Sequence, residues 1–183
     1  MAAAALAVAA HDGQRRKAER DPAPYAVHVF AVAELVAEHT DLGTDGAIAA
    51  VLHDTVEDSD VTLAEVEARF GTAVAALVAA LTDDGAVARL PLAQRKAAQA
   101  AKIAAAPPAA RAIKIADQTS NMRDLPLSGR LWPVARCLTY IAGARRVVDA
   151  CRGPFPALED AFDAAAAAAQ SWAEAREREE SAL

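Results

Sequence analysis

The stretch Val51-Leu-His-Asp-Thr-Val-Glu-Asp58 decides how the rest of the chain is interpreted. It overlaps the apolar run of residues 47–52, which predicts a buried helix. His53 and Asp54 then arrive together, and each has a carboxylate four residues later, on the same face if the helix continues. Unpaired carboxylates are costly to bury, so the group suggests a divalent cation that neutralises them. The alternative is a solvated helix end with local caps, the commoner explanation of an isolated His-Asp pair.

The composition predicts an all-α fold. Hydrophobic side chains make up 54% of the 183 residues, with alanine, the best helix former, in excess, whereas aromatic side chains make up only 4%. This length predicts one domain over residues 1–183 with a proper core. The net charge of −6 argues against a general nucleic-acid-binding protein, which would carry a basic face. It leaves room for a local basic pocket around one phosphorylated small molecule.

Neither a membrane span nor a leader peptide is predicted. No apolar run approaches the length of a membrane-spanning helix. Residues 1–10 lack a basic leading region and run straight into His11-Asp-Gly-Gln, so we expect them to begin the first helix. Cys137 and Cys151 have no metal-type spacing and are expected to be buried free thiols in a reducing compartment. These features predict a cytoplasmic protein.

Proline, glycine and capping signals divide the chain into helices. Thr62 and Glu65 form a capping-box pattern, and Thr44 or Asp45 is expected to cap the helix that delivers the opening motif. Loops are expected at residues 18–24 and 126–129. The helices expected from these signals cover residues 2 to about 17, from about 25 onward, 73–81, 91–105, 111–125, 131–151 and about 157–178.

Several polar residues admit a structural explanation. Arg15, Arg16 and Lys17 could be cations that suit a helix C-terminus, or a clamp for a phosphate or purine. His11 is expected to be a surface or capping residue. Tyr140 could lie in the core or reach a pocket. Three cations of the helix over 91–105 are interpreted as a solvated face: Arg95, Lys96 and Lys102.

The remaining candidates form a set of metal-ligand types, namely His28, His53, Asp54 and Asp117. Two imidazoles and two carboxylates suit Mn²⁺ or Fe²⁺, with Mg²⁺ or Zn²⁺ as further possibilities. Taken alone, His28 beside an apolar stripe is usually a satisfied core histidine. Asp117 follows the apolar-rich run Ile-Lys-Ile-Ala and needs a partner, which could be an arginine as easily as a metal.

The order and spacing of these residues resemble those of HD-domain metal phosphohydrolases. Four motifs further resemble the hydrolase domain of RelA/SpoT homologues: His11-Asp-Gly-Gln-Arg-Arg-Lys17, Pro24-Tyr-Ala-Val-His28, Leu52-His-Asp-Thr-Val-Glu-Asp58 and Lys114-Ile-Ala-Asp-Gln-Thr-Ser-Asn-Met-Arg123. The short chain is similar to the small alarmone hydrolases, which include the metazoan SpoT homologue. The resemblance covers residues 1 to about 153 as the core of one HD hydrolase domain, and leaves 154–183 as a C-terminal helix and charged tail.

The resemblance implies one metal ion, Mn²⁺, held by His28, His53, Asp54 and Asp117. It implies that Glu57 and Asp58 orient or activate the attacking water. Arg16 and Lys17 match a basic pair that contacts the guanosine nucleotide. Asn121 matches a residue that contacts the substrate near the metal, and Tyr140 an aromatic that lines the pocket. The implied reaction removes the 3′-pyrophosphate of ppGpp or pppGpp; with ppGpp it gives GDP and pyrophosphate.

The chain departs from the family pattern at positions that bear on the pocket. Val29 stands where the family usually has proline, Leu92 where an additional lysine is common, and Gln118 where lysine or arginine is commoner. The alternatives are the same chemistry on another phosphorylated nucleotide, such as NADPH, or a non-catalytic nucleotide-binding module. No synthetase segment follows, so synthesis of ppGpp is not expected. A nucleic-acid or membrane partner is not expected either, and the sequence does not predict the oligomeric state.

Overall fold

The computed structural model describes residues 1–17 and 22–182, and these fold into helices. The elements are α1 (Ala2–Ala10), α2 (Ala26–His39), α3 (Gly43–Leu52), α4 (Thr55–Asp58), α5 (Leu63–Phe70), α6 (Thr72–Leu81), α7 (Gly85–Ala88), α8 (Leu92–Ala104), α9 (Pro108–Ser128), the 3-10 turn η1 (Gly129–Leu131), α10 (Val134–Asp149) and α11 (Pro156–Ser181). Across the described residues there is no strand, only an isolated bridge between Arg15 and Pro24. The all-α prediction is confirmed.

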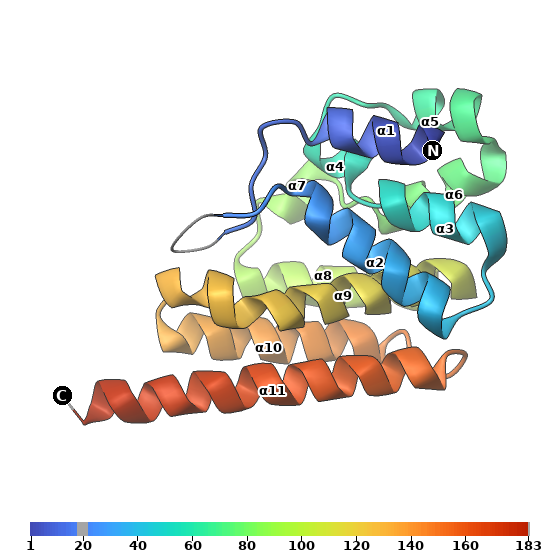
Figure 1. Cartoon of the computed structure of the whole chain (residues 1–183). Coiled ribbons are helices and arrows are strands. Elements are labelled where there is room, and N and C mark those ends of the chain that lie inside the picture. Colours follow the sequence, from blue (N-terminus) through green and yellow to red (C-terminus); the bar gives the residue numbers. More distant parts are fainter. Residues whose placement is uncertain (18–21, 183) are drawn as a thin grey trace.

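Helix α9 is the centre of the molecule. It packs against α11 and α10 on one side and against α2, α3 and α6 on the other, as Figure 1 shows. Every residue from Ala112 to Ser120 is buried, so no face of this segment is left to solvent. Asp117 lies within this segment, which places a carboxylate in the middle of the core.

The long C-terminal helix covers α9 with small side chains and one aromatic ring. Phe162, Ala166 and Ala169 of α11 are fully buried. Small residues allow the two helix backbones to approach closely, and the ring fills the space that remains. Figure 1 shows α8, α9, α10 and α11 running beside one another, with α1 and α3–α6 gathered on the opposite side of α2.

The first helix is shorter than predicted. α1 ends at Ala10, and Gly13 takes the left-handed backbone conformation at φ 72°, so the expected helix to about residue 17 is wrong. The chain then runs extended: the Arg16 N–H donates to the Ala23 carbonyl at 2.8 Å. The basic cluster is therefore not a helix C-terminus. Part of the predicted loop at 18–24 lies outside the described residues.

Two further local predictions are wrong, and others are confirmed. α9 continues through Pro126 to Ser128, because the buried side chains of Met122 and Leu125 hold this turn in the core although proline lacks the helical N–H. α3 begins at Gly43 without a side-chain cap, so neither predicted capping residue acts. The capping box of Thr62 and Glu65 is present, and both cysteines are buried free thiols.

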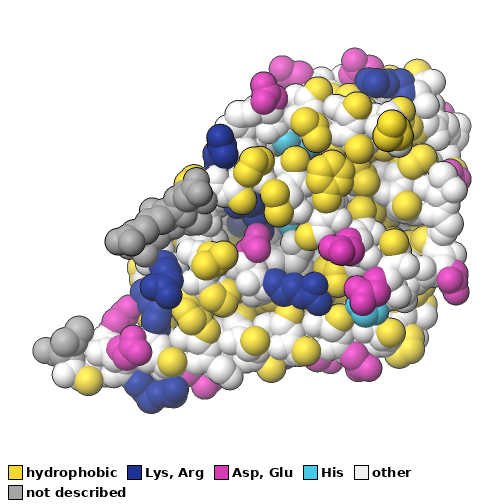
Figure 2. Space-filling model, viewed as in Figure 1, with side chains coloured by type: hydrophobic (Ala, Val, Ile, Leu, Met, Phe, Trp, Pro, Cys, Tyr) yellow, Lys and Arg dark blue, Asp and Glu magenta, His cyan; other side chains and the backbone are white. Residues whose placement is uncertain are grey.

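The described helices can be compared with a membrane span in length and apolarity, and some of them expose hydrophobic side chains. None of them is both long and apolar enough to cross a membrane. The exposed large hydrophobic side chains of α1 and α2 are Val8, Val27 and Phe30. Figure 2 shows hydrophobic groups gathered on this face, with acidic and basic side chains scattered around them.

Candidate metal centre

The opening motif breaks its helix at the point where its ligands begin. α3 ends at Leu52 and α4 starts at Thr55, so the condition that the helix continues through His53 and Asp54 is not met. At this break the His53 ring is 1% exposed, whereas Asp54 faces a pocket. The Asp58 N–H donates to the Asp54 carbonyl at 2.9 Å, and this helical hydrogen bond fixes Asp54 at the start of α4. The break therefore separates one ligand that points into the core from one that borders the pocket.

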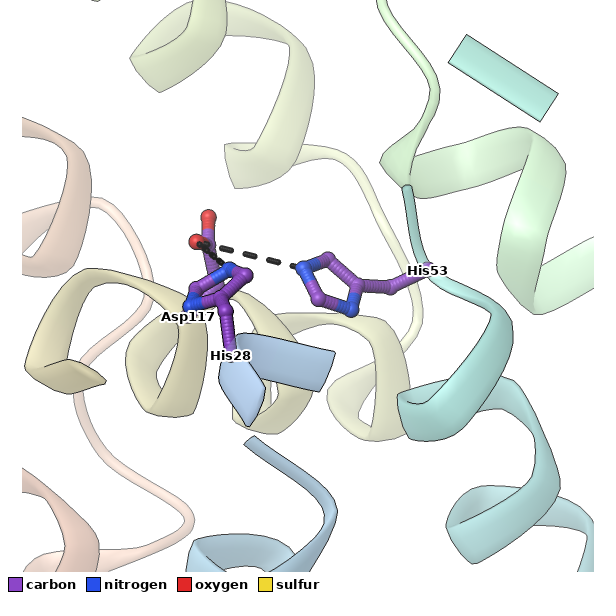
Figure 3. Close-up of side chains that lie close together, drawn as sticks. All are labelled: His28, His53 and Asp117. Carbon is purple, nitrogen blue, oxygen red and sulfur yellow. Dashed lines mark ion pairs between the residues drawn. The ribbon is translucent and has the colours of Figure 1, made fainter. Parts of the chain in front are cut away.

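Three ligand types from distant segments converge there. His28 comes from α2, His53 from the α3–α4 break and Asp117 from α9, and one candidate ligand atom from each lies within 4.8 Å of the others (Figure 3). His28 Nε2 lies 3.4 Å from Asp117 Oδ1, and His53 Nε2 lies 3.9 Å from it. Asp54 completes the set, since its Oδ2 is 3.0 Å from His53 Nε2 and 3.5 Å from His28 Nε2.

The Nε2 atoms of the two imidazoles are suited to bind a cation. Both Nε2 atoms are buried, and neither makes a hydrogen bond in spite of these short distances. A buried nitrogen without a partner is costly unless a ligand satisfies it. The donor set of two imidazoles and two carboxylates fits a divalent cation.

Partners behind the ligands fix their orientation. His53 Nδ1 lies 2.8 Å from the Ala50 carbonyl, and because a carbonyl only accepts, Nδ1 carries the proton and the Nε2 lone pair faces the other ligands. His28 Nδ1 lies 2.9 Å from Ser120 Oγ. The Tyr25 hydroxyl donates to Asp54 Oδ2 at 2.6 Å. Burial alone would raise the pKa of Asp54, but the neighbouring histidines hold it well below its usual value.

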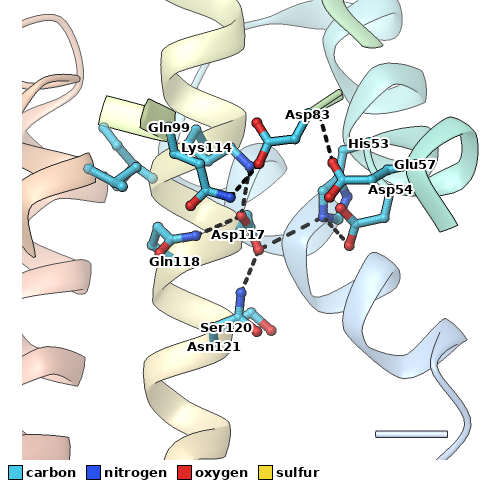
Figure 4. Close-up of polar contacts among 12 residues, drawn as sticks. His53, Asp54, Glu57, Asp83, Gln99, Lys114, Asp117, Gln118, Ser120 and Asn121 are labelled. Carbon is cyan, nitrogen blue, oxygen red and sulfur yellow. Dashed lines mark hydrogen bonds and ion pairs between the residues drawn. The ribbon is translucent and has the colours of Figure 1, made fainter. Parts of the chain in front are cut away.

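Asp117 is held on both oxygens, as Figure 4 shows. Its Oδ2 accepts from Lys114 Nζ at 3.1 Å and from Gln118 Nε2 at 2.8 Å, and its Oδ1 accepts from Asn121 Nδ2 at 2.6 Å. Burial opposes ionisation, but the Lys114 ammonium together with His28 and His53 outweighs it, so the pKa of Asp117 is lowered. Among the described residues its cationic partner is thus a lysine, where the sequence left an arginine or a metal open.

The acidic pair of α4 borders the pocket beside the ligands. Glu57 Oε2 accepts the Asp83 backbone N–H at 2.8 Å. Loss of hydration raises the pKa of Glu57 to about 7, with the charges of Asp83 and Asp54 adding to the rise. Burial and the Asp54 charge also raise the pKa of Asp58. A carboxylate that titrates near neutrality is suited to accept a proton.

These groups open onto one pocket of about 340 Å³. Arg16, Lys17, Asn121 and Tyr140, the four residues predicted to bind substrate, all line it. Arg16 donates to Asp124 at 2.9 Å and to Asn121 at 2.8 Å, and its guanidinium lies 5.6 Å from the Tyr25 ring centroid. Burial raises the pKa of Tyr140 to about 12, so its hydroxyl keeps its proton. Asp54, Glu57, Asp58 and Asp117 line the same pocket, and His28 and His53 lie behind them.

Some residues at this site were not predicted. Lys96 is 4% exposed and borders the pocket, so its assignment to a solvated face is wrong. His11, expected to be a surface or capping residue, occupies the C-cap position of α1 but is only 3% exposed, and its ring centroid lies 4.8 Å from that of Tyr25. Ser120 was not predicted to support His28. Each of the three has a polar neighbour in the sequence, so no surrounding apolar run signalled its burial.

The departures from the family pattern fall into two groups. Leu92 and Gln118 line the pocket, and Gln118 also bonds to Asp117. Val29 is fully buried within α2 and does not line the pocket. The helix starts at Ala26 without the missing proline, so this departure leaves His28 in place.

Comparisons with known proteins agree with this geometry. Residues 3–133 match the model of the HD domain. Human guanosine-3′,5′-bis(diphosphate) 3′-pyrophosphohydrolase MESH1 is 38% identical over 163 residues, covering 87% of this chain and 88% of the human protein. A protein of the same enzymatic name from Vibrio cholerae is 41% identical over 123 residues, 63% of this chain but 16% of that much longer protein.

A solved structure extends the likeness to three dimensions. The metazoan SpoT orthologue described as hydrolysing ppGpp superimposes with a TM-score of 0.81 at 35% identity, covering 90% of this chain and 92% of that one. The predicted resemblance is confirmed. The chain belongs to the HD-domain family and, within it, to the SpoT-related hydrolases that include MESH1.

Proposed function

We propose that this protein is a guanosine-3′,5′-bis(diphosphate) 3′-pyrophosphohydrolase, which converts ppGpp to GDP and pyrophosphate. The observation that carries the proposal is the convergence of two partnerless imidazole nitrogens and two carboxylates at the end of a pocket that also holds cations. The likeness to MESH1 over most of both chains supports the same reaction. The specific cation we propose is Mn²⁺, and the proposed location is the cytoplasm.

Each side chain has a proposed task. His28, His53, Asp54 and Asp117 would hold the cation, which when bound activates water and neutralises phosphoryl charge. Glu57 would accept the proton of the attacking water, because its pKa of about 7 leaves it partly ionised at neutral pH. Asp58, which borders the same end of the pocket, would orient that water.

Cationic and polar side chains of the pocket would hold the anionic substrate. Arg16 lies with its guanidinium over the Tyr25 ring and is fixed by Asp124, so it offers a rigid planar face to a purine base. Lys17 would meet phosphate oxygens, and Tyr140 would form part of the wall. Asn121 bonds both Arg16 and Asp117 and would link the nucleotide side to the metal side. Positioning and charge neutralisation carry most of phosphoryl transfer.

The test is pyrophosphate release from ppGpp by purified protein with Mn²⁺. We expect GDP and pyrophosphate in equal amounts, and loss of both in the His53→Ala and Asp54→Ala variants. NADPH run in parallel tests the alternative substrate by release of inorganic phosphate. Turnover of NADPH without turnover of ppGpp would refute the proposed substrate. Absence of any metal-dependent turnover would favour a non-catalytic binding module.

A further inference from the structure

Lys96 is a buried cation whose partners are neutral. Its Nζ donates to Gln118 Oε1 at 2.7 Å and lies 4.9 Å from the centroid of the Tyr140 ring. Lys96 is in no ion pair with the described part of the chain. Lys114, the other buried lysine of the pocket, does have a carboxylate partner in Asp117.

A buried ammonium in this setting gains from an anion. The Gln118 oxygen accepts from only one of the three N–H donors of the Lys96 ammonium, and the Tyr140 ring attracts the ammonium more weakly than an anion would. Taking a charge out of water without an opposite charge is costly. The cost shows in the pKa of Lys96, which burial lowers to about 8. An anionic group in the pocket would supply the missing counter-charge.

The fold holds Lys96 in place by a close helix contact. A Cβ atom on Gly143 of α10 would lie 2.6 Å from Lys96 Cγ and 3.0 Å from Lys96 Cβ. Only glycine therefore lets the lysine stem lie between α8 and α10 with its ammonium at the pocket wall. Two further cations of the same helices, Arg95 and Arg136, also line the pocket.

The position of Lys96 indicates which anion it would meet. Gln118 stands between Lys96 and Asp117, and it bonds the Oδ2 atom. The other oxygen, Oδ1, is the one that faces His28. Lys96 is thus separated from the candidate ligand atoms by an amide group and two hydrogen bonds, on the far side of the carboxylate. With the phosphate under attack at the ligand atoms, the candidates for Lys96 are the leaving phosphate and the 5′-diphosphate, and pyrophosphate binding distinguishes them.

We propose that Lys96 binds the 5′-diphosphate of the substrate, the group that is not cleaved, and so sets selectivity for nucleotides with phosphate on both sides of the ribose. The assignment rests on the proposed function for the identity of the nucleotide. It gives the pocket two ends: carboxylates and imidazoles for the cleaved phosphate, and α8–α10 cations for the retained one.

The test compares the Lys96→Met variant with a matched control, Lys102→Met, on the same helix. Lys102 is exposed and does not line the pocket, so the control removes the same charge elsewhere. Calorimetry on Mn²⁺-loaded protein gives the Kd of GDP, guanosine, pyrophosphate and Mn²⁺ itself. We expect GDP to bind at least about tenfold more weakly to Lys96→Met, since hydrogen bonds to charged groups have this strength. Guanosine, pyrophosphate and Mn²⁺ should bind within about twofold of wild type.

Other results would overturn the assignment. Unchanged GDP affinity, or a wild-type protein that binds no GDP, refutes it. Weaker pyrophosphate binding would place Lys96 on the leaving group, and weaker Mn²⁺ binding would make it a positioning residue for Asp117. Gly143→Ala provides a second variant that keeps the charge but displaces the stem, and it should weaken GDP binding as well.

The two proposals fail separately. If GDP binding depends on Lys96 but the wild-type protein releases no pyrophosphate from ppGpp, the proposed reaction is wrong and the anion site stands. If the wild-type protein hydrolyses ppGpp and Lys96→Met binds GDP normally, only the Lys96 assignment is wrong. Thermal melting of each variant shows that it is folded, which we expect because methionine replaces a buried charge with an apolar chain of similar length.

Discussion

The Tyr25 hydroxyl should control the affinity of the site for its cation. It donates to Asp54 Oδ2 at 2.6 Å, a short bond to a charged acceptor. Such a bond contributes about 1.5–3 kcal/mol, and loss of a group that orients a metal ligand lowers metal affinity by about 10- to 100-fold. The second range corresponds to about 1.4–2.7 kcal/mol, so the two agree. We expect Tyr25→Phe to weaken Mn²⁺ binding by about 30-fold.

The chain has one other tyrosine, which serves as the control. Tyr140 lines the same pocket, but its hydroxyl makes no hydrogen bond to the described residues. Calorimetric titration of metal-free protein with Mn²⁺ should therefore give Tyr140→Phe the wild-type affinity. A folded Tyr25→Phe protein that binds Mn²⁺ within about twofold of wild type would refute the reasoning. So would an equal loss in Tyr140→Phe, since the effect would then not depend on Asp54.

Three other perturbations have defined outcomes. Glu57→Gln should lower kcat by about 100-fold or more and remove the rise of the wild-type rate with pH near 7. Because the pKa of Glu57 is raised from 4.5 to about 7, the metal-free folded protein keeps a proton in this pH interval that the unfolded chain releases. Urea melts should therefore show that the free energy of unfolding of the wild type falls as the pH rises from about 4.5 to about 7, and that it changes less in Glu57→Gln. Mn²⁺ at about 100 times its Kd should stabilise the wild type by about 2.7 kcal/mol in thermal melts, with no gain in His53→Ala. Phe162→Ala should lower the free energy of unfolding by about 3–5 kcal/mol, because the ring is fully buried; a loss below about 1 kcal/mol in urea would contradict its place in the core.

The candidate ligands that stand in recognisable sequence motifs could be predicted from the sequence. His28, His53 and Asp117 stand in motifs of unusual composition, each next to an apolar run, so both their chemistry and their burial could be inferred. The helices around them followed from alanine content and from breaks such as Gly71, which has φ 89° between α5 and α6. The break after Leu52 could not be predicted, because nothing in Val51–Asp58 opposes a continuous helix.

The rest required tertiary information. Arg95 and Lys96 are neighbours on an amphipathic helix, and only the approach of Gly143 decides that the lysine is the buried one. The end of α1 depends on the left-handed conformation of Gly13, which the sequence alone does not determine. Pro126 normally signals the end of a helix, but burial of Leu125 outweighs the lost hydrogen bond.

The contact between His53 and the Ala50 carbonyl has an electronic effect as well as a geometric one. Ala50 lies in the last turn of α3, where carbonyl groups have no helical N–H to accept and the helix dipole leaves partial negative charge. An imidazole whose N–H points into that charge is a stronger electron donor at its other nitrogen. The end of α3 therefore raises the basicity of one ligand without adding a carboxylate. Such a ligand favours metals that prefer nitrogen, so Zn²⁺ should compete strongly with Mn²⁺ for the protein, and the ion that occupies it in a cell should follow metal availability.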